Sequence, residues 1–152
     1  MKILVGVDDP PHSRAALEWI KRTAWPTGTR LIVMSVSRPA VVAYSLVDAG
    51  GVSYLRAAEE EQVRAHEELA ARVEREMGQA GLITEAKVVE GDPRDALVHT
   101  AEAEGVDLIV VGSHGRTGLQ KLLMGSVASH VVTHAPCSVV VVKLPAGAAK
   151  AA

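Results

Sequence analysis

Hydrophobic residues occur along the chain in short runs that alternate with longer stretches of helical periodicity. The short runs are rich in valine, isoleucine and leucine, and they predict β-strands at residues 2–8, 30–36, 84–90, 107–111 and 138–143. In the intervening stretches apolar residues recur every three or four positions, which predicts helices at residues 13–24, 55–79, 93–104 and 126–134. This alternation favours one α/β domain built on a parallel sheet.

Polar and small residues mark where some of these elements begin and end. Ser13 is the expected N-cap of the first helix, and Asp92 followed by Pro93 predicts the start of the third. Gly105 predicts the end of that helix. Residues 37–54 follow neither period, so we expect an irregular loop there that can hold helical turns. The inward faces of the first two long helices are expected to consist of Ala16, Leu17, Ile20 and Ala24, and of Leu69, Ala70, Val73 and Met77.

The segment between the fourth strand and the last helix carries the candidate ligand-binding chemistry. Gly112 ends the strand, and Ser126 opens the helix after a loop rich in glycine. Glycines allow N–H groups to approach an anion closely, and a helix start adds unpaired N–H donors. Arg116 and Lys121 add positive charge to the same loop. The segment therefore predicts a phosphate-binding loop, although a flexible Gly/Ser connection would share this composition.

The spacing of the loop residues is more specific than their number. It reads Gly112-x2-Gly115-x9-Gly125-Ser126 directly after a buried strand, and it resembles the nucleotide-binding loop of the universal stress protein family. The chain has no G-x-x-x-x-G-K-[ST] motif, no G-x-G-x-x-G motif after the first strand, and no Ser/Thr-rich loop there for a flavin phosphate. The resemblance covers nearly the whole chain, from Asp8 after the first strand to the valine strand that follows Ala135, Pro136 and Cys137.

This resemblance implies a fold and a site. The fold is Rossmann-like, of the adenine nucleotide alpha hydrolase type, with a five-stranded parallel sheet in the order 3-2-1-4-5 and helices on both faces. Ligands of such sheets bind at the carboxyl ends of the strands where the winding direction reverses, here between the first and fourth strands. The resemblance implies that Asp8 binds the ribose of ATP and that Val7 and Val36 line the adenine. The phosphates are implied to bind Gly112, Gly115, Arg116, Gly125, Ser126 and Val127.

Two features near Asp8 leave its role open. The carboxylate is a suitable acceptor for ribose hydroxyls, but it could instead cap the helix that follows. The family usually has a small residue or glycine and then a serine after this aspartate, whereas Asp9, Pro10 and Pro11 stand here before His12. The prolines remove N–H donors, and Asp9 adds negative charge beside a polyanion. We therefore expect Mg²⁺ to accompany the nucleotide, held mainly by phosphate oxygens.

The histidines and the absent motifs argue against fast catalysis. His130 and His134 lie four residues apart, but Val131 stands where an H-E-x-x-H motif has its glutamate, and no third ligand is evident. We therefore predict neither a metal site nor a catalytic residue. His114 lies inside the loop, where it could contact a phosphate, act as a general acid or be solvated.

Three functions remain compatible with these motifs. The first is an ATP-binding stress or regulatory module with at most slow hydrolysis. The second is a nucleotide-free interaction protein that uses the same fold and its dimer. The third is an adenylating enzyme, which we disfavour because the required S-G-G-x-D-S loop is replaced by Val-Asp-Asp-Pro-Pro-His-Ser at residues 7–13.

Composition and charge limit the number of domains, the classes of partner and the cellular compartment that we expect. The 152 residues fit one domain at residues 1–144, followed by a small-residue tail at 145–152 that we expect to be flexible. A net charge of −2 gives no basic footprint for nucleic acid, and no apolar run is long enough for a membrane span. The single cysteine, Cys137, and the absence of a signal peptide pattern at the start lead us to expect the cytoplasm.

The last strand suggests self-association. Residues 138–143 are predicted to form an edge of the sheet, and an edge exposes backbone groups that can pair with another chain. The resemblance implies a homodimer in which Val139 to Val142 pair with the same residues of a second copy. The alternative is that the tail covers this edge.

Overall fold

The computed structural model describes residues 1–8, 12–38, 51–114 and 124–144, with side chains described from residue 56 onward in the second helix. The elements alternate between strand and helix, as the hydrophobic pattern predicted. In chain order they are β1 (Lys2–Val7), α1 (His12–Arg22), β2 (Arg30–Ser37), α2 (Gly51–Gln79), β3 (Ile83–Glu90), α3 (Pro93–Glu104), β4 (Leu108–Gly112), α4 (Ser126–His134) and β5 (Ser138–Val142). The predicted tail at 145–152 lies outside the described residues.

The five strands form one parallel sheet in the order β3-β2-β1-β4-β5, which confirms the expected order 3-2-1-4-5. Val5 of β1 lies opposite Val33 of β2 on one side and Val110 of β4 on the other. The chain winds outward from β1 to β3, crosses back, and continues outward through β4 and β5. The carboxyl ends of β1 and β4 therefore meet where the winding direction reverses.

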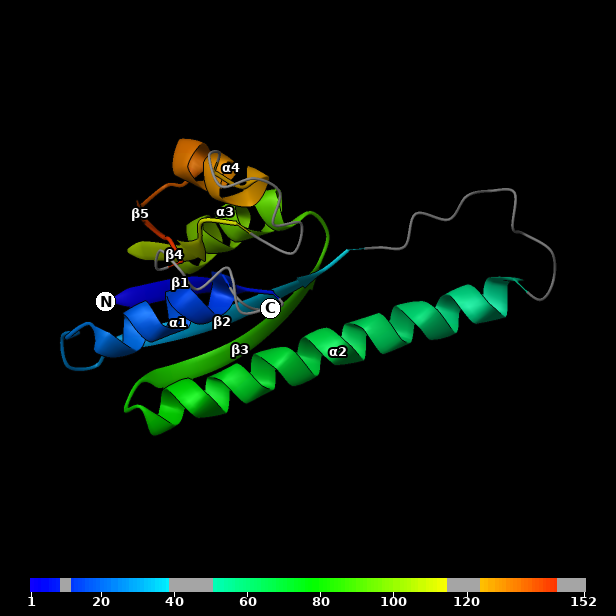
Figure 1. The fold of residues 1–152 in the computed structure, drawn as a ribbon, viewed down its shortest axis with the longest axis horizontal. Helices are drawn as coiled ribbons and strands as arrows, with labels where there is room; N and C mark the ends of the chain where they lie inside the picture. Colours follow the sequence, from blue (N-terminus) through cyan, green and yellow to red (C-terminus); the bar gives the residue numbers. More distant parts are fainter. Residues whose placement is uncertain (9–11, 39–50, 115–123, 145–152) are drawn as a thin grey trace.

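Helices cover both faces of the sheet (Figure 1). One layer of the core lies under α1 and α2, where Ile3, Val5, Ile20 and Met77 are fully buried. The second layer lies under α3 and α4, where Leu4, Met34, Ile109 and Val131 are fully buried. Because alternate residues of the central strands point to opposite layers, both faces are apolar, and this explains the almost continuous hydrophobic runs in the sequence.

Several predicted boundaries shift by a few residues. α1 begins at His12, so Ser13 lies in its first turn and is not the N-cap. The buried hydroxyl of Ser13 instead donates to the carbonyl of Asp8 at 2.5 Å. Ala24 is exposed and lies beyond α1, since the last turn closes with a bond from Thr23 Oγ1 to the carbonyl of Trp19 at 2.8 Å. α2 begins at Gly51, four residues earlier than the pattern predicted.

The caps of α3 follow the sequence prediction. Asp92 has extended backbone, and its carboxylate accepts a bond from the N–H of Arg94 at 2.9 Å. Pro93 occupies the first turn, and Gly105 ends the helix with a left-handed φ of 61°. These signals were readable in the sequence because both caps depend on residues within a few positions of the helix ends.

Asp92→Ala is expected to lower the free energy of unfolding by about 1 kcal/mol at neutral pH, because it removes the acceptor that caps α3. Hydrogen bonds from the side chain and backbone of Arg94 hold the pKa of Asp92 at about 2, below its ordinary value. Since this folded-state pKa lies below that of the unfolded chain, the contribution is fully present above about pH 4 and is lost as pH falls through about 2.

Urea titrations of the wild type and Asp92→Ala, from neutral pH down to about pH 3, test this dependence. The control is Asp92→Asn, which keeps a capping oxygen without the charge and should lose less stability at neutral pH. Equal stability of Asp92→Ala and the wild type at neutral pH would contradict the assignment.

Ion pairs fix α2 against α1. Lys21 Nζ pairs with Glu76 Oε1, and Arg14 Nη1 lies 2.8 Å from Glu76 Oε2. Hydrogen bonding to Lys21 lowers the pKa of Glu76, and the same bond raises the pKa of Lys21. The carboxyl-terminal half of α2 thus has a fixed position, while its amino-terminal half extends past the carboxyl ends of the strands (Figure 1).

Candidate functional site

The ends of β1 and β4 form the centre of the candidate site. The register that pairs Val5 with Val110 continues toward Val7 and Gly112, so these two residues end neighbouring strands at the same edge. Val7 is buried, and Asp8 beyond it is half-buried. The topology therefore brings together two segments that lie about a hundred residues apart in the sequence.

Gly112 also supports the start of α1. A Cβ atom added to Gly112 would lie 2.8 Å from the carbonyl oxygen of His12 and 2.9 Å from its carbonyl carbon. Real Cβ atoms do not approach backbone atoms this closely. Only glycine thus allows the first turn of α1 to pack on the end of β4, a role that the sequence did not reveal.

The loop that leaves β4 is closed at its base by backbone bonds. The N–H of Ser113 donates to the carbonyl of Val142 at 2.8 Å, and the N–H of Gly125 donates to the carbonyl of Ser113 at 2.8 Å. These bonds hold the first residue after β4 and the residue before α4 beside the end of β5. The two ends of the segment that joins β4 to α4 are therefore fixed.

The start of α4 presents backbone donors at this edge. Gly125 is the N-cap and makes no side-chain capping bond. Ser126 is exposed, Val127 is half-buried, and both lie in the first turn, whose N–H groups have no partner within the helix. An anion placed here would meet these N–H groups and the positive end of the helix dipole.

Two histidines lie beside Gly112. The ring centroids of His12 and His114 are 5.1 Å apart, and Ser113 Oγ lies 3.1 Å from His114 Nδ1. Burial lowers the pKa of His12, and the nearby His114 lowers it further. Within the described residues, His12 Nδ1 is buried without a hydrogen-bond partner. His114 is half-buried, so the site offers imidazole groups beside the implied phosphate position rather than a fully solvated loop histidine.

Nearly the whole chain matches a known family. The family model described as "Universal stress protein family" matches residues 1–143 of the chain. The chain belongs to the universal stress protein family.

Individual relatives agree with this membership. A universal stress protein of Thermus aquaticus is 32% identical over 143 residues, which cover 93% of this chain and 97% of the relative. The universal stress protein MJ0577 of Methanocaldococcus jannaschii is 39% identical over 71 residues, 47% of this chain. That match spans only 44% of the relative, and the match to MJ0531 of the same organism spans 38%.

Solved structures of the family share the fold. The structure of MJ0577 has a TM-score of 0.82 at 25% identity and covers 96% of this chain and 97% of its own. A universal stress protein in complex with cAMP has a TM-score of 0.57 at 25% identity and covers 93% of this chain and 94% of its own. A family protein of Arabidopsis thaliana with AMP bound shares the fold at 22% identity and a TM-score of 0.61, over 95% of this chain and 92% of its own.

In this universal stress protein, several predicted site residues lie outside the described part of the chain. They are Gly115 and Arg116 of the loop, together with Lys121 and the segment 9–11 after Asp8. Val36 is half-buried near the end of β2, one strand away from Val7. The described members of the predicted set therefore lie along the carboxyl edge, on the ends of β2, β1 and β4 and the start of α4.

Sequence reasoning missed a polar contact next to Val36. The fully buried hydroxyl of Ser35 lies 2.7 Å from Nδ1 of His66, which reaches it from α2. His66 lies one helical turn before Ala70 on the inward face of α2, and Val73 and Met77 continue that face. The inward periodicity of this helix was the signal that could have found His66.

A second histidine cluster lies on the surface of α3 and α4. His130 Nε2 is 3.3 Å from Asp95 Oδ1, and the rings of His130 and His134 stack with centroids 4.2 Å apart. His134 Nδ1 lies 2.9 Å from the carbonyl of His130. Among the residues that the structure describes, no group of three or more histidine, cysteine or acidic side chains is arranged to hold a metal ion. The described helices also include none long and apolar enough to cross a membrane.

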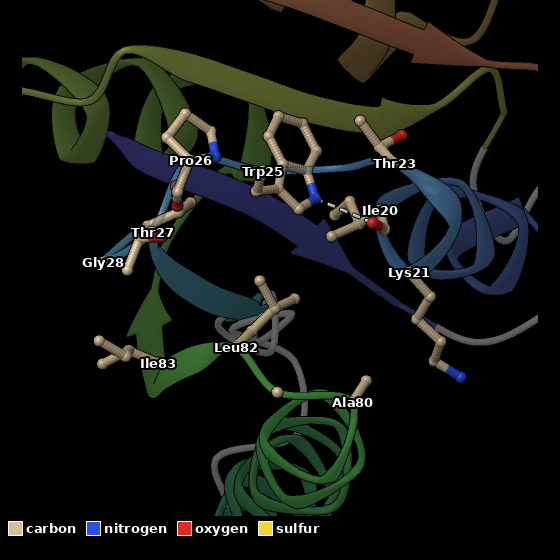
Figure 2. Close-up of a pocket in the computed structure, with 12 residues that line it drawn as sticks. Ile20, Lys21, Thr23, Trp25, Pro26, Thr27, Gly28, Ala80, Leu82 and Ile83 are labelled. Atoms are coloured by element: carbon tan, nitrogen blue, oxygen red, sulfur yellow. Dashed lines mark hydrogen bonds between the residues drawn. The ribbon is translucent and has the colours of Figure 1, made fainter.

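A cavity among the described residues lies at the opposite, amino-terminal edge of the sheet (Figure 2). It measures about 500 Å³ and is bordered by the end of α1, the turn before β2 and the turn before β3. Two of its polar side chains have partners: Trp25 Nε1 donates to the carbonyl of Ile20 at 2.9 Å, and Lys21 pairs with Glu76. The cavity lies away from the end of the sheet where ligands of such folds bind.

Proposed function

We propose that this universal stress protein binds ATP at the carboxyl edge of its sheet and acts as a nucleotide-dependent stress-response or regulatory module. The observation that carries the proposal is the pair of fixed loop ends at Ser113 and Gly125, which set an uncapped helix start beside the ends of β4 and β5. Backbone donors at a helix start suit phosphate, and the half-buried carboxylate of Asp8 suits the paired hydroxyls of a ribose.

Relatives support an adenine nucleotide as the ligand class. The family member solved with cAMP is 25% identical to this chain and covers nearly all of it. The Arabidopsis thaliana protein with AMP bound is more distant, and its likeness supports the fold alone. cAMP contains adenine and ribose, so the part of the site that would be shared is the base and sugar end.

The proposed roles follow the positions of the residues. Val7 and Val36 line the adenine, with Val36 contributing backbone groups, and Asp8 accepts hydrogen bonds from the ribose. The phosphates bind backbone and hydroxyl groups after β4 and at the start of α4, assisted by one cation. These phosphate-binding residues are Gly112, Gly115, Arg116, Gly125, Ser126 and Val127.

Mg²⁺ is proposed to bind together with the nucleotide. The described part of the chain presents no preformed cluster of three acidic or histidine ligands, so it offers no all-protein cage. Mg²⁺ commonly takes one or two carboxylates plus substrate phosphates and waters. The ion would be held mainly by phosphate oxygens, and it would offset the negative charge that Asp8 and Asp9 add beside the phosphates.

Fast hydrolysis is not part of the proposal. Burial lowers the pKa of His12, and its Nδ1 is buried without a hydrogen-bond partner among the described residues. Slow hydrolysis is compatible with such a site, and a nucleotide-free interaction protein remains the competing function.

Mass spectrometry of the denatured protein distinguishes these functions. Protein equilibrated with excess ATP and Mg²⁺ and then passed through a desalting column is expected to release ATP in an amount comparable to the protein. Release of ADP or AMP alone would indicate turnover. The absence of any adenine nucleotide would favour the interaction protein.

The proposed protein is a cytoplasmic homodimer. The valines of β5 are half-buried, and the strand pairs only with β4 within the described residues. Pairing Val139 to Val142 with a second copy would satisfy the outer backbone groups of β5. Sedimentation velocity at micromolar protein is expected to give about twice the chain mass of 16.0 kDa. A single species of the chain mass under these conditions would contradict the dimer.

A further inference from the structure

The carboxyl end of β2 is fastened to α2 by two side chains of that helix. His66 Nδ1 lies 2.7 Å from Ser35 Oγ, and Gln62 Nε2 donates to the carbonyl of Arg38 at 3.1 Å. Gln62 and His66 are four residues apart, so they lie on the same side of α2. Their partners lie on either side of Val36, one residue before it and two residues after it. Two bonds therefore hold the short segment that contains Val36.

The bond to Ser35 extends to β1. Ser35 is 0% exposed, and its hydroxyl donates to the carbonyl of Val7 at 3.2 Å. A serine hydroxyl has one proton, so when Ser35 donates to Val7 its oxygen must accept a hydrogen bond from the Nδ1–H of His66. The three residues then form one directed chain of hydrogen bonds from α2 through β2 to β1. That chain ends at the residue before Asp8.

The carboxyl-terminal half of α2 is fixed by core packing and by ion pairs with α1. Ala70 and Met77 are fully buried in the core on the same face of the helix as His66. Glu76, near the end of α2, is paired with Lys21 and Arg14 of α1. His66 lies one helical turn before Ala70, at the start of the carboxyl-terminal half of α2.

We propose that Gln62 and His66 are positioning residues for the base and ribose end of the nucleotide site, a role that rests on the proposed function. They fix the backbone around Val36 and the carbonyl of Val7, and so set the distance between the two walls of the adenine site and the position of Asp8. The phosphate end depends on different elements, because its fixed points are Ser113 and Gly125 beside β5. Loss of the α2 bonds should therefore weaken binding of the nucleoside part and leave binding of the phosphate part unchanged.

Calorimetric titration with two probes tests this division. AMP reports the base and ribose end, and inorganic tripolyphosphate reports the phosphate end alone. His66→Ala is expected to weaken AMP binding by about tenfold, the effect of losing a buried hydrogen bond, with no change for tripolyphosphate. His66→Asn should restore AMP affinity, because the asparagine amide can place a donor near the position of Nδ1. Arg64→Ala is the matched control on α2, since its side chain is 65% exposed and points away from the sheet contacts.

The outcomes separate the inference from the proposed function. Unchanged AMP affinity in His66→Ala, or an equal loss for both probes, would overturn the positioning role. ATP binding by the wild type would still support the proposed function in that case. A wild type that binds no adenine nucleotide would overturn both. If His66→Ala does not fold, Gln62→Glu provides the second variant, since a carboxylate cannot donate to the Arg38 carbonyl, and it should show the same selective loss for AMP.

Discussion

Gly112→Ala is expected to lower the free energy of unfolding by about 1–3 kcal/mol, the cost of forcing an extra group into a packed site. The added Cβ would meet the carbonyl group of His12 at 2.8–2.9 Å, and backbone atoms cannot rotate away as a side chain can. Relief requires the first turn of α1 to move off the end of β4. That movement would also displace Asp8, because the Ser13 hydroxyl of this turn donates to its carbonyl. We therefore expect weaker ATP binding together with the loss of stability.

Urea unfolding of Gly112→Ala beside Gly78→Ala measures the first effect. Gly78 lies within α2, and a Cβ there would make only an ordinary contact of 3.4 Å with Thr84 Oγ1. Alanine is favoured over glycine in a helix by about 0.5–1 kcal/mol, so this control should be as stable as the wild type or more so. If both variants matched the wild type, the close approach of α1 to β4 would not hold in solution.

Gly125→Val is expected to reduce ATP affinity by more than about 100-fold, equivalent to losing several phosphate contacts. Gly125 has φ −60° and ψ 153°, a conformation that any residue adopts, so valine should fit without backbone strain. Its branched side chain would instead occupy the space in front of the first-turn N–H groups of α4, where a phosphate must approach. The fold should survive while the phosphate position is blocked.

Calorimetry with ATP and Mg²⁺, paired with thermal unfolding, tests this second effect. Gly125→Ala adds only a methyl group and should fall between the wild type and Gly125→Val in affinity. Gly78→Ala should bind like the wild type, because it lies on α2 away from the loop. ATP affinity unaffected by valine at position 125 would remove Gly125 from the phosphate site.

The sequence was sufficient to predict the architecture because the necessary signals are local or periodic. Apolar runs predicted every strand to within a few residues, and the strand order followed once the family resemblance was stated. The Asp92 and Gly105 caps were predicted because each depends on neighbours in the chain. The start of α1 was predicted less well, since Ser13 serves as a donor to Asp8 and not as the cap that its residue type suggests.

Long-range contacts were not readable in this way. The bond between Ser35 and His66 joins residues 31 positions apart, and neither residue type marks it in the sequence. The approach of His12 to Gly112 spans a hundred residues, so Gly112 was interpreted only through its implied phosphate role. Asp95 reaches His130 from a different helix and supplies a partner that the sequence of α4 could not show. Such contacts depend on the position and orientation in which each helix packs on the sheet. The hydrophobic pattern does not specify either of these.

Mapping ATP onto the backbone amides by two-dimensional NMR tests the central claim most directly, since it shows both whether ATP binds and where. With ATP and Mg²⁺ added, the account predicts the largest shifts at Gly112, Ser113, Ser126 and Val127, with Asp8 also affected. Amides around the cavity at the amino-terminal edge, such as Gly28 and Gly81, should stay unchanged. An absence of shifts at millimolar ATP, or shifts confined to that cavity, would contradict the nucleotide site proposed here.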